Sequence, residues 1–131
     1  MKRIGLTGNI GTGKTTIARI FEILGVPVYH ADLQARLIME TDFVIAGVEK
    51  MFGRQVLNSN RQVDRKALAA IVFKKKKKLA ALNSLLHPLV EKDFSDWCET
   101  HKHQPYILHE AAILFESGFD RLFDATVLVV A

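Results

Sequence analysis

A glycine-rich segment near the N-terminus restricts the possible folds of this chain more than any other part of it. Residues 8–15, Gly-Asn-Ile-Gly-Thr-Gly-Lys-Thr, match the pattern G-x-x-x-x-G-K-S/T at every fixed position. The apolar run Ile4–Leu6 precedes this segment, and apolar residues at helical spacing follow it to about Leu24. A strand, a glycine-rich turn and a helix in this order predict a P-loop in an α/β fold.

The segment predicts a site for a nucleoside triphosphate. Gly8, Gly11 and Gly13 permit backbone angles that side chains would block, so that successive N–H groups can point at phosphate oxygens. Lys14 is expected to contact the β- and γ-phosphates during catalysis, and Thr15 to bind Mg²⁺ through its hydroxyl. The predicted nucleotide-binding residues are Gly8, Asn9, Ile10, Gly11, Thr12, Gly13, Lys14, Thr15 and Thr16. An ordinary glycine turn before a helix is the competing interpretation.

The rest of the sequence alternates strands with helices. Further strands are predicted at Val26–Tyr29, Tyr106–Leu108 and Ala125–Val130, the last of them covered on both faces. Helices are predicted at 33–39 with Asp32 as cap, 43–52, 65–73 with Asp64 as cap, 77–86, and 88 to about 101. A break at His87-Pro88 is expected, because a residue before proline avoids the helical region.

This pattern predicts an α/β fold in which helices flank a parallel sheet. The 131 residues suffice for a single domain, 1–131. The sequence stops directly after a predicted strand, where a parallel sheet normally continues into a crossover helix. We therefore expect the domain to be incomplete at its C-terminus.

Composition excludes several classes of protein. The charge of +4 suits polyanionic ligands, but it equally suits an ordinary basic surface inflated by the run Lys74–Lys78. No nucleic-acid-binding pattern accompanies that run, and no apolar stretch approaches the length of a membrane span.

Cys98 is the single cysteine, which fits a reducing compartment. We expect a cytoplasmic protein with small-molecule partners, and the sequence gives no oligomeric state.

Two acidic residues follow predicted strands and are candidates for chemistry. In open α/β sheets, ligands bind beyond the carboxyl ends of the strands, so Asp32 should share a crevice with the P-loop. Its carboxylate could accept a hydroxyl proton from a phosphoryl acceptor, or it could simply cap the next helix. Glu110 is expected to support Mg²⁺ or its water shell, the alternative being a solvated strand end.

Other polar residues give weaker signals. Arg36 lies one helical turn after Asp32, so it could bind acceptor phosphate or pair with Asp32. His87, before Pro88, is more typical of a structural turn than of a catalyst. His30 and His109 lie near strand ends without the spacing of metal ligands, so no histidine metal site is predicted.

Together these residues resemble the dephospho-CoA kinase family. The resemblance rests on four segments in order: Ile4–Thr15, Gly25–Asp32, Leu86-His87-Pro88 and Ile113–Gly118. It implies phosphorylation of the ribose 3′-hydroxyl of dephospho-CoA by ATP and Mg²⁺ to give coenzyme A. It also implies a Rossmann-like P-loop NTPase core, a helical CoA-binding insertion at about 43–101 and a mobile lid.

The resemblance also implies roles for individual residues. By it, Asp32 is the catalytic base, and Arg36, His87, Phe115 and Glu116 contact or shape the acceptor pocket. The chain departs from the family where Glu110-Ala111-Ala112 replaces the common Asp-x-Pro. Family members also continue through an arginine-bearing lid, a final strand and a helix. We therefore expect these 131 residues alone to bind ATP weakly and turn over poorly.

Two alternatives to this reaction remain at the level of the sequence. One is a P-loop kinase for another small acceptor, such as a nucleoside monophosphate. The other is a non-catalytic nucleotide-binding module or switch. No guanine-reading Asn-Lys-x-Asp occurs in the sequence, which argues against a GTPase.

Overall fold

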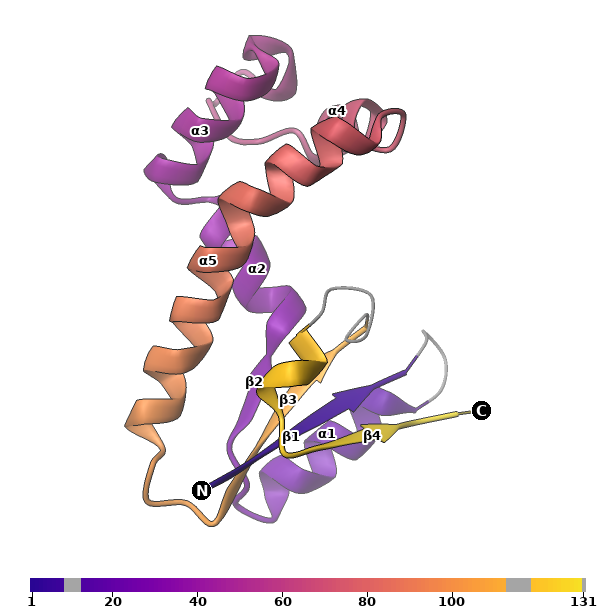
Figure 1. Cartoon of the computed structure of the whole chain (residues 1–131), viewed down its shortest axis with the longest axis vertical. Coiled ribbons are helices and arrows are strands. Elements are labelled where there is room, and N and C mark those ends of the chain that lie inside the picture. The colour runs from indigo at the N-terminus through magenta and orange to yellow at the C-terminus, as the bar shows by residue number, and fades with distance from the viewer. Residues whose placement is uncertain (9–12, 113–118, 131) are drawn as a thin grey trace. The chain divides into compact units, whose positions relative to one another are not determined.

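The structure is a computed structural model that describes residues 1–8, 13–112 and 119–130 (Figure 1). Its strands are β1 (Lys2–Thr7), β2 (Val28–His30), β3 (Tyr106–Ala111) and β4 (Ala125–Leu128). Its helices are α1 (Lys14–Ile23), α2 (Ala31–Met39), α3 (Asp42–Phe52), α4 (Arg65–Val72) and α5 (Lys76–Thr100), with 3₁₀ turns η1 (Arg54–Val56) and η2 (Phe119–Leu122). Contacts divide the chain into two compact units: a sheet unit, Met1–Leu33 with Phe94–Ala131, and a helical unit, Gln34–Asp93.

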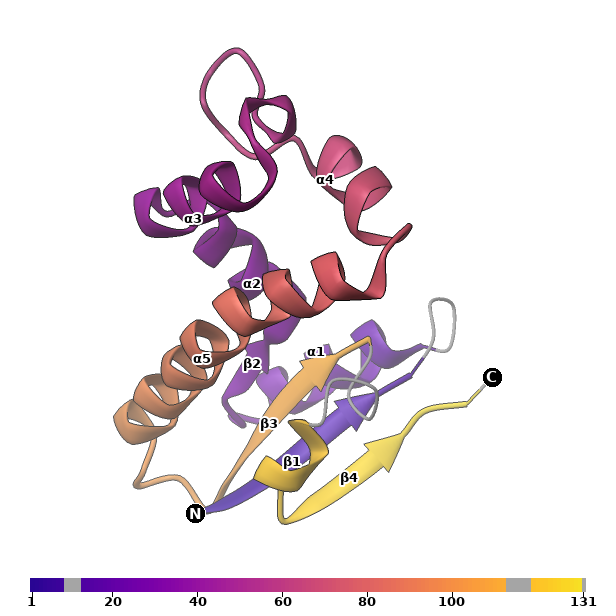
Figure 2. The ribbon, with the colours of Figure 1, turned by 45° about the horizontal axis from the view of Figure 1, so that its top comes forward.

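The described strands form a four-stranded parallel sheet in the order β2-β3-β1-β4 (Figure 2). β1 therefore lies between two strands that come about a hundred residues later in the sequence. Because the strands are parallel, their carboxyl ends all meet at one edge of the sheet. The predicted α/β class with a parallel sheet and flanking helices is confirmed.

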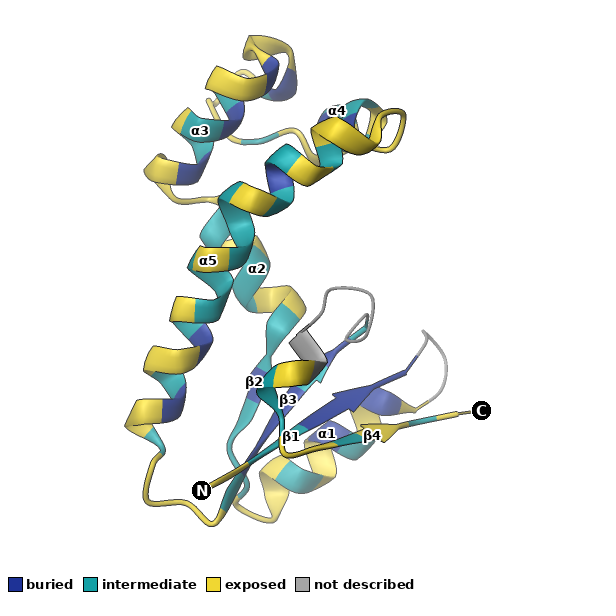
Figure 3. Ribbon diagram, viewed as in Figure 1, coloured by how far each residue is buried: buried dark blue, intermediate teal, exposed yellow. Residues whose placement is uncertain are grey.

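Apolar residues pack against both faces of the central strands of the sheet. Successive residues of a strand point to opposite faces, and Ile107 and Leu108 of β3 accordingly belong to different clusters. Leu108 packs with residues of β1 and α1, whereas Ile107 packs with Phe94 and Cys98 of α5. Figure 3 shows buried residues along β1 and β3. Packing on both faces fixes the position of these strands, and therefore of the edge of the sheet at which their carboxyl ends lie.

β4 differs from the predicted strand in its environment and its length. It ends at Leu128 rather than Val130, and it pairs with β1 at the edge of the described sheet. Val127 is 49% exposed and Leu128 59% exposed, so the expectation of a strand covered on both faces is wrong. A continuous apolar run indicates only that a strand could be buried. Whether it is buried depends on the elements that pack against it.

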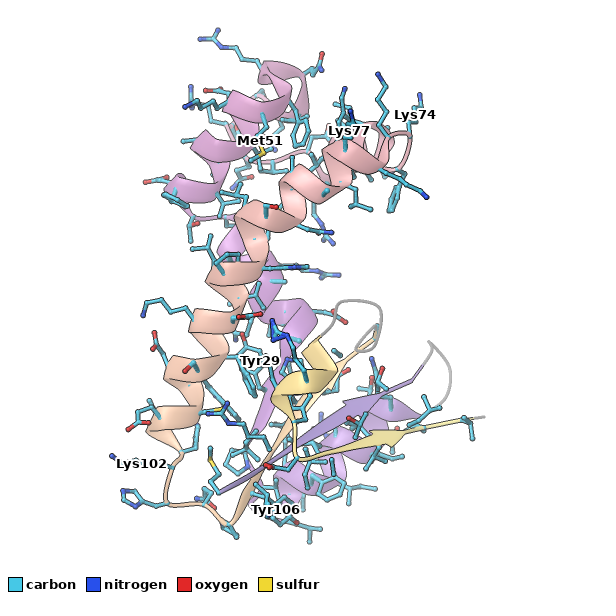
Figure 4. All side chains as sticks on the ribbon, viewed as in Figure 1. Tyr29, Met51, Lys74, Lys77, Lys102 and Tyr106 are labelled. Atoms are coloured by element: carbon cyan, nitrogen blue, oxygen red, sulfur yellow. The ribbon has the colours of Figure 1, made fainter. Side chains whose placement is uncertain are left out.

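The helical unit has an apolar core of its own. The core contains Val44 and Val48 of α3, Leu68 and Val72 of α4, and Leu82 of α5. As predicted, Asp64 caps α4: the backbone N–H of Ala67 donates to its Oδ1 at 3.2 Å. The lysines of the 74–78 run are all exposed, and Figure 4 labels Lys74 and Lys77 among them. No helix in the described part of the chain is long and apolar enough to cross a bilayer.

α5 continues through Pro88, so the predicted break at His87-Pro88 is wrong. His87 consequently lies inside a helix rather than at a junction. A proline within a helix removes one backbone hydrogen bond and costs roughly 3 kcal/mol. Apolar clusters hold α5 on both sides of the proline, through Leu82 before it and Phe94 after it. Burial of such side chains contributes about 1.5–3 kcal/mol each, which offsets the cost.

His109 is a buried histidine in the apolar layer between β3 and α5. It is 2% exposed, and its ring lies 5.3 Å from that of Tyr29 and 4.8 Å from those of Phe94 and Phe123, centroid to centroid. Neither ring nitrogen has a hydrogen-bond partner among the described residues. Burial lowers the pKa of His109 to about 4. The ring is therefore a neutral aromatic core residue at physiological pH.

We expect His109→Phe to remove an acid-dependent loss of stability. Between pH 6.5 and about 4, His109 is protonated in the unfolded chain but neutral in the fold, so the unfolded state binds more protons. Stability is therefore unaffected by this group above pH 6.5 and falls as the pH falls through this window. Between neutral pH and about pH 5, the parent chain should lose about 2 kcal/mol more than the variant in urea unfolding. His109→Leu controls for overpacking by phenylalanine, and equal pH dependence in all three chains would contradict the assignment.

Candidate active site

The predicted phosphate-binding segment lies between the end of β1 and the start of α1. Gly8 and Gly13 to Thr16 belong to the described residues, whereas Asn9, Ile10, Gly11 and Thr12 lie outside them. Gly13 immediately precedes α1 with φ 89°, in the left-handed region that favours glycine. Thr15 and Thr16 are exposed in the first turn of α1. β1 before the segment and α1 after it thus lie where the motif predicts.

Lys14 and Glu110, which sequence analysis singled out separately, form an ion pair. Lys14 Nζ lies 2.7 Å from Glu110 Oε1, and the two side chains are only 10% and 12% exposed. Lys14 is the first residue of α1, and Glu110 lies near the carboxyl end of β3, the strand beside β1. Because water is largely excluded, this pair interacts more strongly than a surface pair. Removing one member of such a pair costs about 3–5 kcal/mol, because the other charge is left buried alone.

The second carboxylate oxygen of Glu110 extends this pair into a chain of contacts. Glu110 Oε2 lies 3.2 Å from His30 Nδ1, and His30 Nε2 lies 3.1 Å from Glu22 Oε1. His30 is opposite Glu110 in the register of β2 and β3. The side chains of His30 and Glu22 are 36% and 46% exposed, so the outer end of this chain reaches solvent. The contacts join α1, β3 and β2 around Lys14.

Sequence reasoning missed this chain of contacts. It placed His30 near a strand end without giving it a role, and it did not single out Glu22. The available signal was that His30 and Glu110 both end strands of one parallel sheet, whose carboxyl ends meet at one edge. What the sequence did not reveal was that β2 and β3 are neighbours in that sheet.

Asp32 lies in the first turn of α2, so its predicted role as N-cap is wrong. β2 ends at His30 and α2 begins directly at Ala31, which leaves no loop residue for Asp32 to occupy. The start of a helix is still a favourable place for its negative charge. β2 is parallel to β3 and β1, so Asp32 follows the same edge of the sheet as the Lys14–Glu110 pair. Its carboxylate is exposed and makes no hydrogen bond or ion pair within the described residues.

The other predicted acceptor-site residues are not gathered at this edge by the described contacts. Arg36 is exposed on α2 and His87 is half-buried within α5, and both belong to the helical unit. Phe115 and Glu116 lie outside the described residues. The structure therefore joins Lys14 with Glu110 and leaves the roles of these four residues as predictions.

Thr15 and Glu110 offer the kinds of oxygen atom that Mg²⁺ prefers. Mg²⁺ in phosphate-transferring sites usually takes one or two protein oxygens, substrate phosphate oxygens and several waters. Within the described residues, no three or more His, Cys, Asp or Glu side chains form a metal-binding group. A hydroxyl and a carboxylate thus fit Mg²⁺ as a partial set that a nucleotide would complete. Because both oxygens of Glu110 already have partners, Glu110 suits the water shell of the metal better than direct ligation.

Comparison with known proteins gives a consistent result. The sequence matches the family model described as Dephospho-CoA kinase over residues 2–131. It is 41% identical to the dephospho-CoA kinase of Chlorobaculum tepidum over 98% of this chain and 65% of that protein. It is 38% identical to that of Fusobacterium nucleatum, over 98% of this chain and 66% of that protein.

Solved structures agree with the sequence comparison. The crystal structure of TT1252 from Thermus thermophilus matches with a TM-score of 0.84 and 32% identity, over 98% of this chain and 65% of that chain. Dephospho-CoA kinase from Campylobacter jejuni matches with a TM-score of 0.76 and 25% identity, over 96% of this chain and 64% of that chain. The chain thus spans about two thirds of the length of these relatives.

Proposed function

The chain belongs to the dephospho-CoA kinase family, and from this premise we propose that it phosphorylates the ribose 3′-hydroxyl of dephospho-CoA with ATP, giving coenzyme A. The observation that carries the proposal is the shielded Lys14–Glu110 pair at the start of α1. It holds the Lys14 ammonium group at the start of α1, which supports the predicted contact of Lys14 with the β- and γ-phosphates. A cytoplasmic enzyme without nucleic-acid or membrane partners is part of the same proposal.

ATP binding would use the start of α1 and the glycine-rich segment before it. The backbone N–H groups of residues 8–16 and the helix N-terminus would hold the phosphates. The Lys14 ammonium has three donors, so it can keep its bond to Glu110 while donating to phosphate oxygens. An ammonium group already fixed in position stabilises the charge that develops during transfer without further reorganisation.

Mg²⁺ would accompany the nucleotide. Thr15 would hold it through the side-chain hydroxyl, and Glu110 would order its waters. When bound, Mg²⁺ would neutralise charge on the phosphates of the nucleotide.

Asp32 would act on the acceptor. Its exposed carboxylate, without a partner among the described residues, is available to accept the proton of the 3′-hydroxyl as that oxygen attacks phosphorus. Arg36, His87, Phe115 and Glu116 would contact or shape the acceptor pocket, and the helical region at about 43–101 would hold the CoA portion. These assignments follow from the family, and each is testable by substitution.

Direct assay tests the proposed reaction. The protein as the cell produces it should convert dephospho-CoA and ATP with Mg²⁺ to a product carrying a new 3′-phosphate, identified by mass spectrometry and phosphorus NMR. Dephospho-CoA should also suppress turnover of any other acceptor, such as a nucleoside monophosphate. ATP binding without this product would retain the nucleotide site and overturn the acceptor.

We expect His30→Ala to weaken ATP binding by roughly three- to tenfold, the effect of one lost hydrogen bond. The reason is that His30 holds Glu110, which in turn fixes Lys14. His30→Asn, which can place an amide N–H near the position of Nδ1, should recover most of the affinity. Titration calorimetry with a non-hydrolysable ATP analogue measures both variants. Equal affinity in the alanine variant and the parent would show that His30 has no such role.

A further inference from the structure

A surface pocket in the helical unit has two arginines in its wall. Its volume is about 110 Å³, enough for a phosphate-sized group with water. The pocket is lined by Arg36, Met39, Glu40, Gln62, Val63 and Arg65. Arg36 comes from α2 and Arg65 is the first residue of α4, so segments distant in the sequence build one wall.

The two guanidinium groups have no acidic partner within the described residues. Within the described residues, neither Arg36 nor Arg65 forms an ion pair or hydrogen bond through its side chain. Glu40 also lines the pocket, so two arginines and one glutamate give its wall one excess positive charge. The Glu40 carboxylate likewise has no ion-pair partner in the described part of the chain. A bound anion would supply the missing partner, because arginine binds phosphate oxygens with parallel N–H donors.

The backbone that carries Gln62 and Arg65 is fixed by hydrogen bonds. Asn58 Oδ1 accepts from the backbone N–H groups of Asn60 and Gln62 at 2.9 and 3.0 Å, and the Asn58 N–H donates to the Gln62 carbonyl at 2.8 Å. The Asp64 N–H donates to the Val56 carbonyl at 2.7 Å. This side of the pocket is therefore preorganised, which lowers the entropy lost when a ligand binds.

We propose that this pocket binds the diphosphate group of the acceptor, with Arg36 and Arg65 contacting its oxygens and the Gln62 amide donating a further hydrogen bond. The identity of the ligand rests on the proposed function, because dephospho-CoA carries a diphosphate between its adenosine and its pantetheine arm. Met39 and Val63 supply an apolar wall for the carbon atoms next to that group. The glycine-rich segment is already assigned to the phosphates of ATP, so a second polyphosphate site suits the second substrate.

The matched pair Arg65→Gln and Lys66→Gln tests this assignment. Both remove one positive charge from the first turn of α4, and both side chains are exposed, but only Arg65 lines the pocket. Arg65→Gln should raise the KM for dephospho-CoA roughly tenfold or more, as expected for a lost charged hydrogen bond. It should leave the KM for ATP unchanged, and Lys66→Gln should leave both values unchanged. An unchanged KM for dephospho-CoA in Arg65→Gln would overturn the proposal while the proposed function stands.

A binding measurement separates this proposal from the proposed reaction. With the nucleotide site saturated by ADP and Mg²⁺, inorganic pyrophosphate is titrated into the parent protein and both variants, with binding followed by calorimetry. Weaker binding in Arg65→Gln alone supports the pocket even where no phosphorylated product forms. Absence of binding at millimolar pyrophosphate, or equal binding in all three proteins, overturns it.

Discussion

Lys14→Ala is expected to lower kcat by about a hundredfold to a thousandfold and to weaken ATP binding below detection. Both effects are expected because a fixed positive charge at the phosphates is lost. The structure adds a second effect. Without the Lys14 ammonium, the negative charge of Glu110 stays shielded from water but loses its positive partner. This variant should therefore also lose about 3 kcal/mol of stability. The prediction is checked by activity, ATP titration and urea unfolding on the same preparation.

The double variant Lys14→Ala/Glu110→Gln separates these two effects. It removes both charges of the pair, so the stability of the fold should largely return. ATP binding should remain undetectable and turnover should remain as low as in Lys14→Ala, because the phosphate-binding ammonium is still missing. Substantial turnover by either variant would refute the phosphate-binding role of Lys14.

Asp32→Asn is expected to lower kcat by about a hundredfold to ten-thousandfold while leaving the affinity for ATP nearly unchanged. Asparagine keeps the size of the side chain but cannot accept the proton of the attacking hydroxyl. Steady-state kinetics and calorimetric titration with an ATP analogue measure the two quantities independently. This pattern is expected of a group that acts in the transition state and not in nucleotide binding.

Asp42→Asn is the matched control for that variant. Asp42, like Asp32, is an exposed acid in the first turn of a helix, so its replacement measures the effect of losing such a charge. It should change stability slightly and leave kcat unaltered. A near-normal kcat in Asp32→Asn would instead assign Asp32 to helix stabilisation alone.

Local patterns in the sequence predicted much of the fold. The strand before the glycine-rich segment, the helix after it and the cap at Asp64 depend on neighbouring residues, and all three appear where they were expected. Two of the predictions that failed depend on distant parts of the chain. α5 continues through Pro88 because apolar clusters hold it on both sides, and the exposure of β4 follows from its place in the sheet.

The candidate site was predicted only residue by residue. The motif identified Lys14, and the strand-end rule identified Glu110 and Asp32. The pairing of Lys14 with Glu110 and the contacts through His30 to Glu22 require the strand order, which no local pattern contains. Asp32 was misplaced as a cap because β2 continues to His30 and α2 starts without a loop.

The sequence positions of the two units have a consequence for synthesis on the ribosome. The helical unit is one continuous stretch, Gln34–Asp93, whereas the sheet unit needs both Met1–Leu33 and the segment from Phe94 onward. β1 is synthesised before the helical unit, whereas its partners β3 and β4 are synthesised after it. The nascent chain therefore carries β1 with both hydrogen-bonding edges open until Tyr106 and later residues emerge. Chains that stall before that point should be targets for chaperones, even though their helical unit is complete.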